Sequence, residues 1–182
     1  MVISLLIIQA KKSNFTTIDQ FIEKAQQRIN AISLVHENLY QSEYFDEGSI
    51  KEYIVKLVSH IESNLDSTTQ KVSFMTNITG IMLNIQTMIA CGLIINELVT
   101  NSLKYAFENI VNPLIQISFT ELPEYFVLRI SDNGNGMLHQ NQKKTMGFEL
   151  VRMLTLQLNG DCKFKNSNGL SVIITFPKTN KT

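Results

Sequence analysis

The chain has 182 residues, and its 16 Lys and Arg are balanced by 16 Asp and Glu, so its formal net charge is zero at pH 7. This balance gives no support to nucleic acid or to an anionic membrane as a partner, since both attract basic proteins. Hydrophobic residues make up 44% of the sequence, enough for one ordinary domain with a sizeable core and a small accessory module. The two cysteines, Cys91 and Cys162, lie far apart and predict buried or half-buried free thiols in a reducing cytoplasm.

The first 48 residues show the pattern of a helical hairpin. Residues 1–12 are an apolar run that lacks the basic region and cleavage site of a signal peptide and is too short to span a bilayer, so we interpret it as the end of a helix whose beginning is absent. A long helix is predicted over 18–42, because apolar residues recur there at steps of three and four: Ile18, Phe21, Ile22, Ala25, Ile29, Ile32, Val35 and Leu39. A hairpin cannot enclose its own apolar stripes, so we predict a homodimer in which two copies form a four-helix bundle.

The rest of the chain, residues 49–182, predicts a second domain. After a loop over 43–49, a helix capped by Ser49 is expected over 50–65, and the polar stretch 66–70 leads into the sheet part, which begins at about residue 70. Further helices are predicted over 86–108 and 146–158, and strands over 71–76, 114–121, 125–132, 161–165 and 171–176. Residues 137–146 are polar without a period and predict a mobile loop. This order indicates an α+β sandwich with one sheet covered on one face.

One polar face of the helix predicted over 86–108 is the first candidate site. Glu97, Asn101 and Lys104 are spaced i, i+4 and i+7, which places them on the same side of a helix that is otherwise mostly apolar. An amide oxygen suits Mg²⁺, which prefers oxygen ligands and keeps waters and phosphate oxygens; the lysine can reach a phosphate, and the glutamate can hold a metal-bound water or orient a nucleophile. A solvated helix face that happens to be polar would give the same pattern.

A strand end followed by glycines is the second candidate. Asp132 comes directly after the apolar strand over 125–132, and Gly134 and Gly136 follow it. The carboxylate can accept a hydrogen bond from an exocyclic amine such as that of adenine, and the glycines let the backbone pass close to a flat base. Alone, this pattern also fits an ordinary turn; together, the two motifs in one short module favour a site for a magnesium nucleotide. Lys143 and Lys144 either close over phosphates or remain solvated.

These segments resemble the motifs of the GHKL ATPase superfamily. Its N box is similar to N-E-L-V-T-N-S-L-K-Y-A-F, its two glycine boxes to I-S-D-N-G-N-G-M and T-M-G-F-E-L-V-R-M-L, and its closing strand to N-G-L-S-V-I-I-T-F-P. Within the superfamily, R-I-N-A-I-S-L-V-H-E-N-L-Y-Q-S resembles the second dimerisation helix of sensor histidine kinases, in particular the subfamily whose acceptor motif reads H-R-V-K-N-N-L-Q. The resemblance covers nearly the whole chain.

The resemblance implies a Bergerat ATP-binding fold with bound ATP and Mg²⁺. It implies Asn101 on the metal, Glu97 on the metal through water, and Asp132 on adenine. It also implies that the pocket and its lid are lined by Lys104, Tyr105, Gly134, Gly136, Met137, Thr145, Gly147 and Phe148. Two departures concern the glutamate, which stands where many histidine kinases have asparagine, and the second glycine box, where Thr145 and Glu149 occupy positions that are glycine in many kinases.

The implied activity is transfer of the ATP γ-phosphoryl to a histidine and then to a response regulator receiver domain. In the resembled family the acceptor histidine precedes V-I-S-L-L and would lie upstream of this chain, as would any sensor domain. We therefore interpret His36 as a packed helix residue rather than an acceptor, His60 as a surface residue and His139 as a solvated loop residue. The alternatives are a serine kinase of the anti-sigma-factor type, which lacks the helical hairpin, and a non-catalytic dimeric nucleotide-binding scaffold.

Overall fold

The computed structural model describes residues 22, 25–26, 28–34, 47–63, 71–136 and 146–178. Several sequence predictions lie outside these residues: the helix remnant over 1–12, the ends of the long helix over 18–42, and the loop over 137–145. Six residues that the sequence analysis singled out also lie outside the described residues: His36, Met137, His139, Lys143, Lys144 and Thr145.

A mixed five-stranded sheet forms one layer of the molecule, in the order β2-β4-β5-β7-β6. Its strands are β2 (Ser73–Ile78), β4 (Leu114–Glu121), β5 (Tyr125–Asp132), β6 (Asp161–Ser167) and β7 (Gly169–Pro177). The pairs β4/β5, β5/β7 and β6/β7 are antiparallel, whereas β2 runs parallel to β4. The predicted bounds of β4 and β5 agree with the structure. Buried and less buried side chains alternate along both strands, which is the pattern from which they were predicted.

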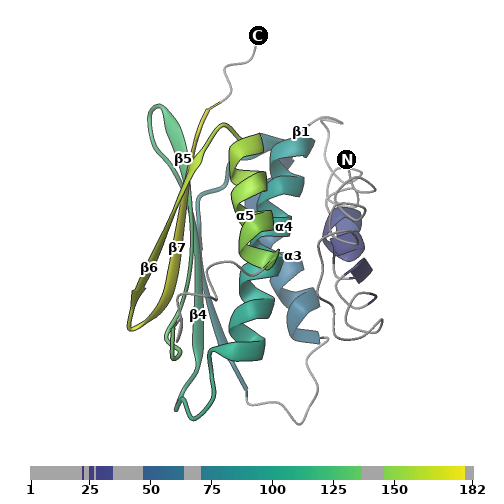
Figure 1. Cartoon of the computed structure of the whole chain (residues 1–182). Helices are drawn as coiled ribbons and strands as arrows, with labels where there is room; N and C mark the ends of the chain where they lie inside the picture. The colour runs from purple at the N-terminus through teal and green to yellow at the C-terminus, as the bar shows by residue number, and fades with distance from the viewer. Residues whose placement is uncertain are drawn as a thin grey trace.

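Three helices form the second layer, on one face of that sheet (Figure 1). They are α3 (Ile50–Ser63), α4 (Ile85–Tyr105) and α5 (Met146–Gln157). Near the start of α3 the Ser49 Oγ accepts the amide of Glu52 at 3.4 Å, as the predicted cap requires. The predicted α+β sandwich is therefore confirmed.

The sequence prediction was wrong at one short element. Residues 47–49 were predicted as part of a loop, but Glu47–Ser49 forms β1, which pairs antiparallel with β3 (Met82–Asn84). Two strands of three residues are too short to show a period of two in the sequence. β1 directly precedes α3, and β3 directly precedes α4. Asn84, the last residue of β3, accepts the Thr87 amide at 2.8 Å as the N-cap of α4.

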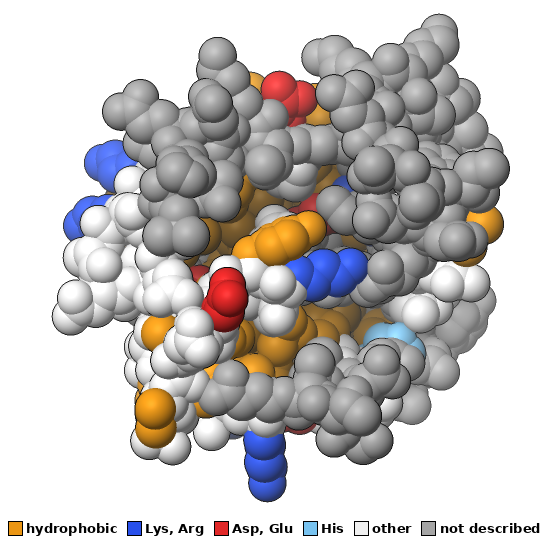
Figure 2. Space-filling model, turned by 60° about the horizontal axis from the view of Figure 1, so that its bottom comes forward, with side chains coloured by type: hydrophobic (Ala, Val, Ile, Leu, Met, Phe, Trp, Pro, Cys, Tyr) orange, Lys and Arg blue, Asp and Glu red, His pale blue; other side chains and the backbone are white. Residues whose placement is uncertain are grey.

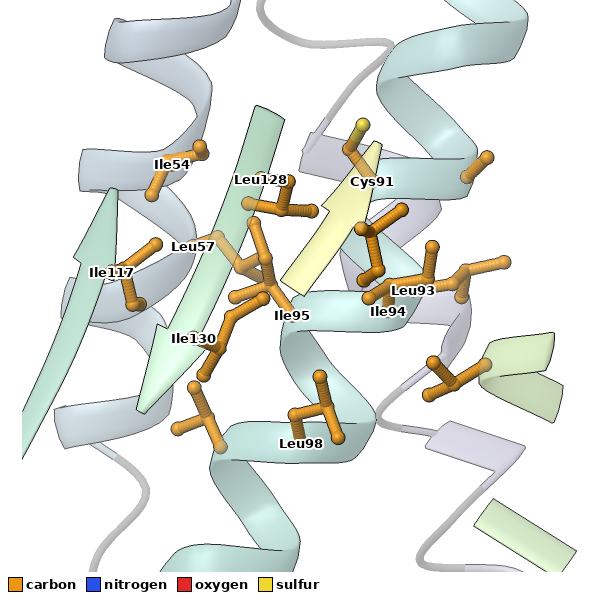
Figure 3. Close-up of a cluster of buried hydrophobic side chains, with 14 of the residues drawn as sticks. Ile54, Leu57, Cys91, Leu93, Ile94, Ile95, Leu98, Ile117, Leu128 and Ile130 are labelled. Atoms are coloured by element: carbon orange, nitrogen blue, oxygen red, sulfur yellow. The ribbon is translucent and has the colours of Figure 1, made fainter. Parts of the chain in front are cut away.

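The core lies between the helices and the inner face of the sheet (Figure 3). Helix α4 is buried on nearly all sides because it is covered by α3, α5 and the sheet. Its Cys91 is completely buried, and burial raises the pKa of this thiol to about 12. Cys162 on β6 is half-buried, so both cysteines are free thiols of the predicted kind.

A short helical segment, residues 28–34, packs against this domain from outside the two layers. Ala31 is 1% exposed, and its carbonyl accepts the Tyr53 hydroxyl of α3 at 3.0 Å. His60 of α3 is partly exposed, in keeping with the predicted surface position, and its Nε2 lies 3.2 Å from Asn30 Nδ2 in an exposed contact. The predicted apolar stripe is only partly covered, and Ile29 remains 49% exposed.

Candidate functional site

The two sequence motifs meet at one end of the sandwich, where α4 and β5 end and α5 begins (Figure 1). Figure 2 shows this end of the molecule hollowed, with apolar side chains on the floor of the hollow and charged side chains beside it. The site has two sides. The first side is built on Asp132 of β5, and the second on Glu97 and Asn101 of α4.

The Asp132 carboxylate is held by three hydrogen bonds. Its Oδ1 accepts the backbone amides of Gly134 at 3.0 Å and Leu170 at 3.1 Å, and its Oδ2 accepts the Ser102 hydroxyl of α4 at 2.7 Å. The residue is 8% exposed, and a buried carboxylate is stable only when it is hydrogen-bonded in this way. Because each carboxylate oxygen can accept two hydrogen bonds, Oδ2 retains the capacity to accept one more donor.

The loop after Asp132 is attached to the loop after α4 by two asparagines. Asn133 Oδ1 accepts the Leu114 amide at 2.7 Å, and its Nδ2 donates to the Asn112 carbonyl at 3.0 Å. Asn135 donates its amide to the Ala106 carbonyl and its Nδ2 to the Glu108 carbonyl, both at 2.8 Å. These bonds fix the first glycine box against the end of the N-box helix.

Two glycines allow this close approach. A Cβ at Gly134 would overlap the Ala106 carbonyl oxygen. Gly169, at the turn between β6 and β7, has a φ of +97°, and a Cβ there would overlap the Asp132 carbonyl. The hairpin of β6 and β7 thus reaches the site, which explains how the amide of Leu170 meets Asp132.

The second side of the site contains Glu97, Asn101 and Gly147. A Cβ on Gly147, at the start of α5, would lie 3.0 Å from both Asn101 Nδ2 and Glu97 Oε2, so the two α4 side chains converge on the first turn of α5 as their spacing predicts. Asn101 Nδ2 is buried and has no hydrogen-bond partner in the described part of the chain. The unpaired Nδ2 is a hydrogen-bond donor, so it fits an acceptor such as a phosphate oxygen, whereas the oxygens of the Asn101 amide and the Glu97 carboxylate are the ligand type that Mg²⁺ prefers.

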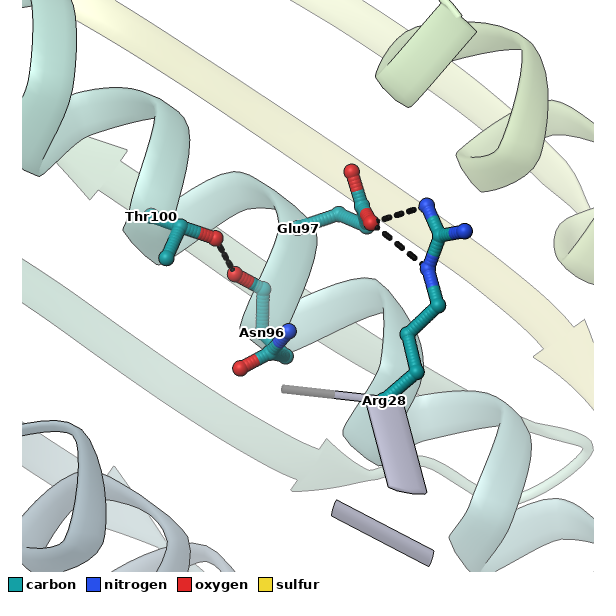
Figure 4. Close-up of polar contacts among 4 residues, drawn as sticks. All are labelled: Arg28, Asn96, Glu97 and Thr100. Carbon is teal, nitrogen blue, oxygen red and sulfur yellow. Dashed lines mark hydrogen bonds and ion pairs between the residues drawn. The ribbon is translucent and has the colours of Figure 1, made fainter. Parts of the chain in front are cut away.

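Glu97 is already paired in this structure (Figure 4). Nε of Arg28 donates to Glu97 Oε1 at 2.9 Å, and Nη2 of the same guanidinium contacts the same oxygen. The side chains are 6% and 5% exposed, so this is a buried ion pair between the outer helical segment and the N-box helix. Within α4, Thr100 Oγ1 also donates to the Asn96 carbonyl.

The other predicted site residues have different surroundings. Lys104 and Tyr105 are exposed near the end of α4, and the Tyr105 side chain is 70% exposed. Gly136 has a φ of +67° beside Asn166 of β6. Phe148 lies in the core, edge-on to Phe164 with ring centroids 5.3 Å apart. Met137 and Thr145 lie outside the described residues.

Sequence reasoning missed Ser102, Leu170 and Arg28. Ser102 lies within the motif that contains Asn101, but five positions after Glu97 it faces β5 rather than α5. A polar residue on a different face of this mostly apolar helix was the sequence signal that could have identified Ser102. Leu170 contributes only its backbone amide, which its side-chain type does not reveal. Arg28 pairs with Glu97, which is 69 residues away, and no local sequence pattern predicts such a contact.

Two family models match the chain. Residues 1–65 match a histidine kinase family, and residues 88–180 match the family of histidine kinase-, DNA gyrase B- and HSP90-like ATPases. No curated protein matches the sequence.

Solved structures of histidine kinases share the fold. The histidine kinase domain of the Erythrobacter litoralis EL346 blue-light activated kinase is 18% identical, with a TM-score of 0.76 over 97% of this chain and 84% of that one. The Acinetobacter baumannii histidine kinase AdeS is 16% identical, with a TM-score of 0.60 over 99% and 96%. The mycobacterial sensor histidine kinase MprB is 14% identical, with a TM-score of 0.55 over 72% and 96%.

The chain belongs to the family of histidine kinase-, DNA gyrase B- and HSP90-like ATPases. The histidine kinase match that precedes the ATPase match makes it, more particularly, part of a two-component sensor histidine kinase, an enzyme that binds ATP. This order disfavours the serine kinase alternative, which lacks the helical hairpin. Among the described residues, no helix has both the length and the apolar character needed to cross a membrane.

Proposed function

We propose that the hollow between α4, β5 and α5 binds ATP with Mg²⁺, with adenine against Asp132 and the metal against Asn101. The observation that carries this proposal is the Asp132 carboxylate, which is held by Ser102, Gly134 and Leu170 and keeps one acceptor position on Oδ2. This position accepts the exocyclic amine of adenine. The two backbone amides on Oδ1 keep the carboxylate in place whether or not a base is bound.

Selection of adenine follows from the same geometry. Guanine and hypoxanthine carry a carbonyl oxygen where adenine carries an amine, and two oxygens facing each other would leave a buried acceptor without a donor. Sites that hydrogen-bond a ligand group discriminate strongly against analogues that lack it, because the partner in the site is left unpaired. The site therefore prefers ATP to ITP and GTP.

Phosphate and metal binding are assigned to the second side of the site. Asn101 offers an amide oxygen to Mg²⁺, and Glu97 holds a metal-bound water or orients the attacking histidine. Bound magnesium would neutralise charge on the phosphate oxygens. The exposed Lys104 reaches toward the phosphates, Tyr105 toward the ribose, and the first turn of α5 presents backbone amides with the positive end of the helix dipole.

The reaction is transfer of the γ-phosphoryl from ATP to an imidazole nitrogen of a histidine, which leaves ADP. The protein contributes chiefly the positions of the two reactants and the neutralisation of charge, since phosphoryl transfer needs little covalent help. Glu97 and Asn101 are the residues proposed to act nearest the transferred group. A receiver domain of a response regulator then takes the phosphoryl group.

The proposed assembly is a cytoplasmic homodimer formed through the helices over 1–48. In the single chain Ile22 is 47% exposed and Ile29 is 49% exposed, so part of the predicted apolar stripe is free to pack on a second copy. Dimerisation would cover both side chains and complete a four-helix bundle.

Base preference tests the proposed function. We expect isothermal titration calorimetry to show that the wild-type chain binds ATP more tightly than ITP. In Asp132→Asn, the remaining amide oxygen still accepts the amides of Gly134 and Leu170, and the new NH₂ group donates to Ser102, so the fold is retained. That NH₂ group faces the adenine amine, and we expect ATP affinity to fall by about 100-fold while the preference for ATP over ITP disappears or reverses.

A matched control is Asp161→Asn, since this aspartate is exposed at the start of β6, away from the site. It should leave both affinities unchanged. An Asp132→Asn protein that folds, as judged by circular dichroism, and still prefers ATP by the wild-type ratio would remove Asp132 from base recognition and with it the proposed function.

A further inference from the structure

We propose that Arg28 is a positioning residue of the ATP site: by holding one oxygen of Glu97, it leaves a single carboxylate oxygen to the metal-nucleotide and so favours Mg²⁺ over Ca²⁺. The arginine belongs to the outer helical segment, residues 28–34, so the region that precedes the ATP-binding domain contributes to the metal selectivity of its site. This inference rests on the proposed function of Glu97 at the metal.

The ion pair directs the two oxygens of Glu97 to different parts of the molecule (Figure 4). Nε of Arg28 donates to Oε1 at 2.9 Å, and Nη2 contacts the same oxygen. Oε2 lies at the start of α5, where a Cβ on Gly147 would be 3.0 Å from it and 3.0 Å from Asn101 Nδ2. The oxygen beside Asn101 is therefore not the one that accepts the hydrogen bonds of the guanidinium.

Apolar packing of the segment places the guanidinium. Arg28, Ala31 and Ile32 are spaced i, i+3 and i+4, which puts them on one face of the helix. Ala31 is 1% exposed, and Ile32 and Leu34 pack against the core of the ATP-binding domain. Because these apolar contacts hold the segment without help from Glu97, Arg28 reaches the carboxylate from a fixed position.

A role in stability alone does not account for this pair. The side chains of Arg28 and Glu97 are 6% and 5% exposed, and Arg28 is the one buried cation in the described part of the chain. Two charges lose their hydration when they are buried, so such a pair adds little net stability compared with apolar side chains in the same places. What the pair does determine is the orientation of the carboxylate, since a partner that hydrogen-bonds one oxygen directs the other.

A carboxylate that offers one oxygen suits Mg²⁺ better than Ca²⁺. Mg²⁺ is small and keeps several waters in an octahedral shell, whereas Ca²⁺ takes about six to eight oxygens and accepts both oxygens of one carboxylate. With Oε1 committed to Arg28, Glu97 serves the metal through Oε2 or through a water, and it does not supply both oxygens. The pair therefore withholds the second oxygen that Ca²⁺ would gain.

The test is the ratio of ATP affinities with Mg²⁺ and with Ca²⁺, measured by calorimetry with either metal in excess. The wild-type chain should bind ATP more tightly with Mg²⁺. In Arg28→Gln both oxygens of Glu97 are available, and we expect the ratio to fall about tenfold, an effect typical of partners that orient a metal ligand. Loss of the guanidinium charge cancels in the ratio, because both metals are divalent cations and gain the same attraction.

Two further variants keep the test independent of folding. Arg28→Gln/Glu97→Gln has no unpaired buried charge, so its fold should be retained, and the amide at position 97 offers a single oxygen; the ratio should return to near the wild-type value. Should Arg28→Gln fail to fold because Glu97 is left buried and unpaired, Arg28→Lys replaces it. Lysine keeps the charge but loses the two-nitrogen contact, and we expect the ratio to fall about threefold.

Tyr53→Phe is the matched control, since it loosens the same segment without touching the site. It removes the hydroxyl that donates to the Ala31 carbonyl at 3.0 Å, one turn along the segment from Arg28. This variant should lower the urea midpoint of unfolding and leave the ratio at the wild-type value. An equal fall of the ratio in Tyr53→Phe would assign the selectivity to the packing of the segment and overturn the role of Arg28.

Two other results would also overturn the inference. A ratio that is unchanged in the folded Arg28 variants would make the ion pair purely structural. A reduced ratio that persists in Arg28→Gln/Glu97→Gln would show that Arg28 acts on the metal-nucleotide directly rather than through Glu97. In both cases a wild-type chain that prefers ATP to ITP leaves the proposed function intact, whereas absence of any ATP binding would refute the inference and the proposed function together.

Discussion

The two sides of the candidate site differ in how completely the chain has arranged them. On the side proposed to bind adenine (the adenine side), Asp132 is held by one hydroxyl and two backbone amides, and the surrounding loops are fixed to each other by Asn133 and Asn135. On the side proposed to bind the metal (the metal side), Glu97 is bound to a residue from another part of the chain, and Asn101 has a buried nitrogen without a partner among the described residues.

The difference indicates that the polar groups of the adenine side are preorganised and that those of the metal side are only partly paired. The adenine side needs only a ligand to fill its last acceptor position, because its polar atoms keep their partners with or without a base. On the metal side, Arg28 binds only Oε1 of Glu97, and Oε2 and the Asn101 amide face the first turn of α5.

The largest expected effect is a loss of folding stability when a glycine is replaced by alanine, and it should differ between Gly134 on the adenine side and Gly147 on the metal side. A Cβ at Gly134 meets the backbone carbonyl of Ala106, which cannot move without breaking the contact between the two loops, whereas a Cβ at Gly147 meets only the ends of the side chains of Asn101 and Glu97 at 3.0 Å. We expect Gly134→Ala to lower the free energy of unfolding by about 1–3 kcal/mol. Gly147→Ala should lower it by less, about 0.5 kcal/mol. Urea denaturation measures both; equal losses would contradict the claim that one side is rigid and the other adaptable.

The variant Asn101→Asp, which replaces the amide by a carboxylate, tests the metal side alone. Asn101→Asp places a second negative charge beside Glu97 without changing the size of the side chain, so the fold should survive. We expect the gain in ATP affinity that magnesium provides to fall about tenfold, because the altered charge and donor set disturb the metal's surroundings. Titration with and without magnesium separates this gain from base binding. Loss of affinity in EDTA as well would show that the two sides are not independent.

The smallest expected effect is on the adenine side. Ser102→Ala removes one of the three donors on Asp132 and leaves the two backbone amides in place. We expect ATP affinity to fall about fivefold, which corresponds to the ~1 kcal/mol that one hydrogen bond typically contributes. The magnesium-dependent gain should not change. A loss as large as that in Asp132→Asn would mean that the hydroxyl, rather than the backbone, holds the carboxylate.

The fold could be predicted from the sequence where local patterns are long enough. Strands β4 and β5 alternate over eight residues each, and α4 and α5 are apolar segments too long for strands, so the predicted bounds were close to those found. Strands β1 and β3 have three residues each, too few for a period. The parallel pairing of β2 with β4 depends on a crossover, which no local pattern encodes.

The site was predicted in the same uneven way. The helical spacing of Glu97 and Asn101 correctly indicated one face, and that face meets Gly147. The hydroxyl of Ser102 lies on a second face of the same helix, which a buried helix can present but a surface helix would not. The contact with Arg28 depends on how the outer segment packs, and nothing in the sequence around either residue specifies it.

A crystal structure of the chain with Mn²⁺ and a non-hydrolysable ATP analogue tests the central claim most directly. The account predicts the adenine amine on Asp132 Oδ2 and the metal beside Asn101. A nucleotide bound away from the end of β5, or a metal bound away from Asn101, would contradict it.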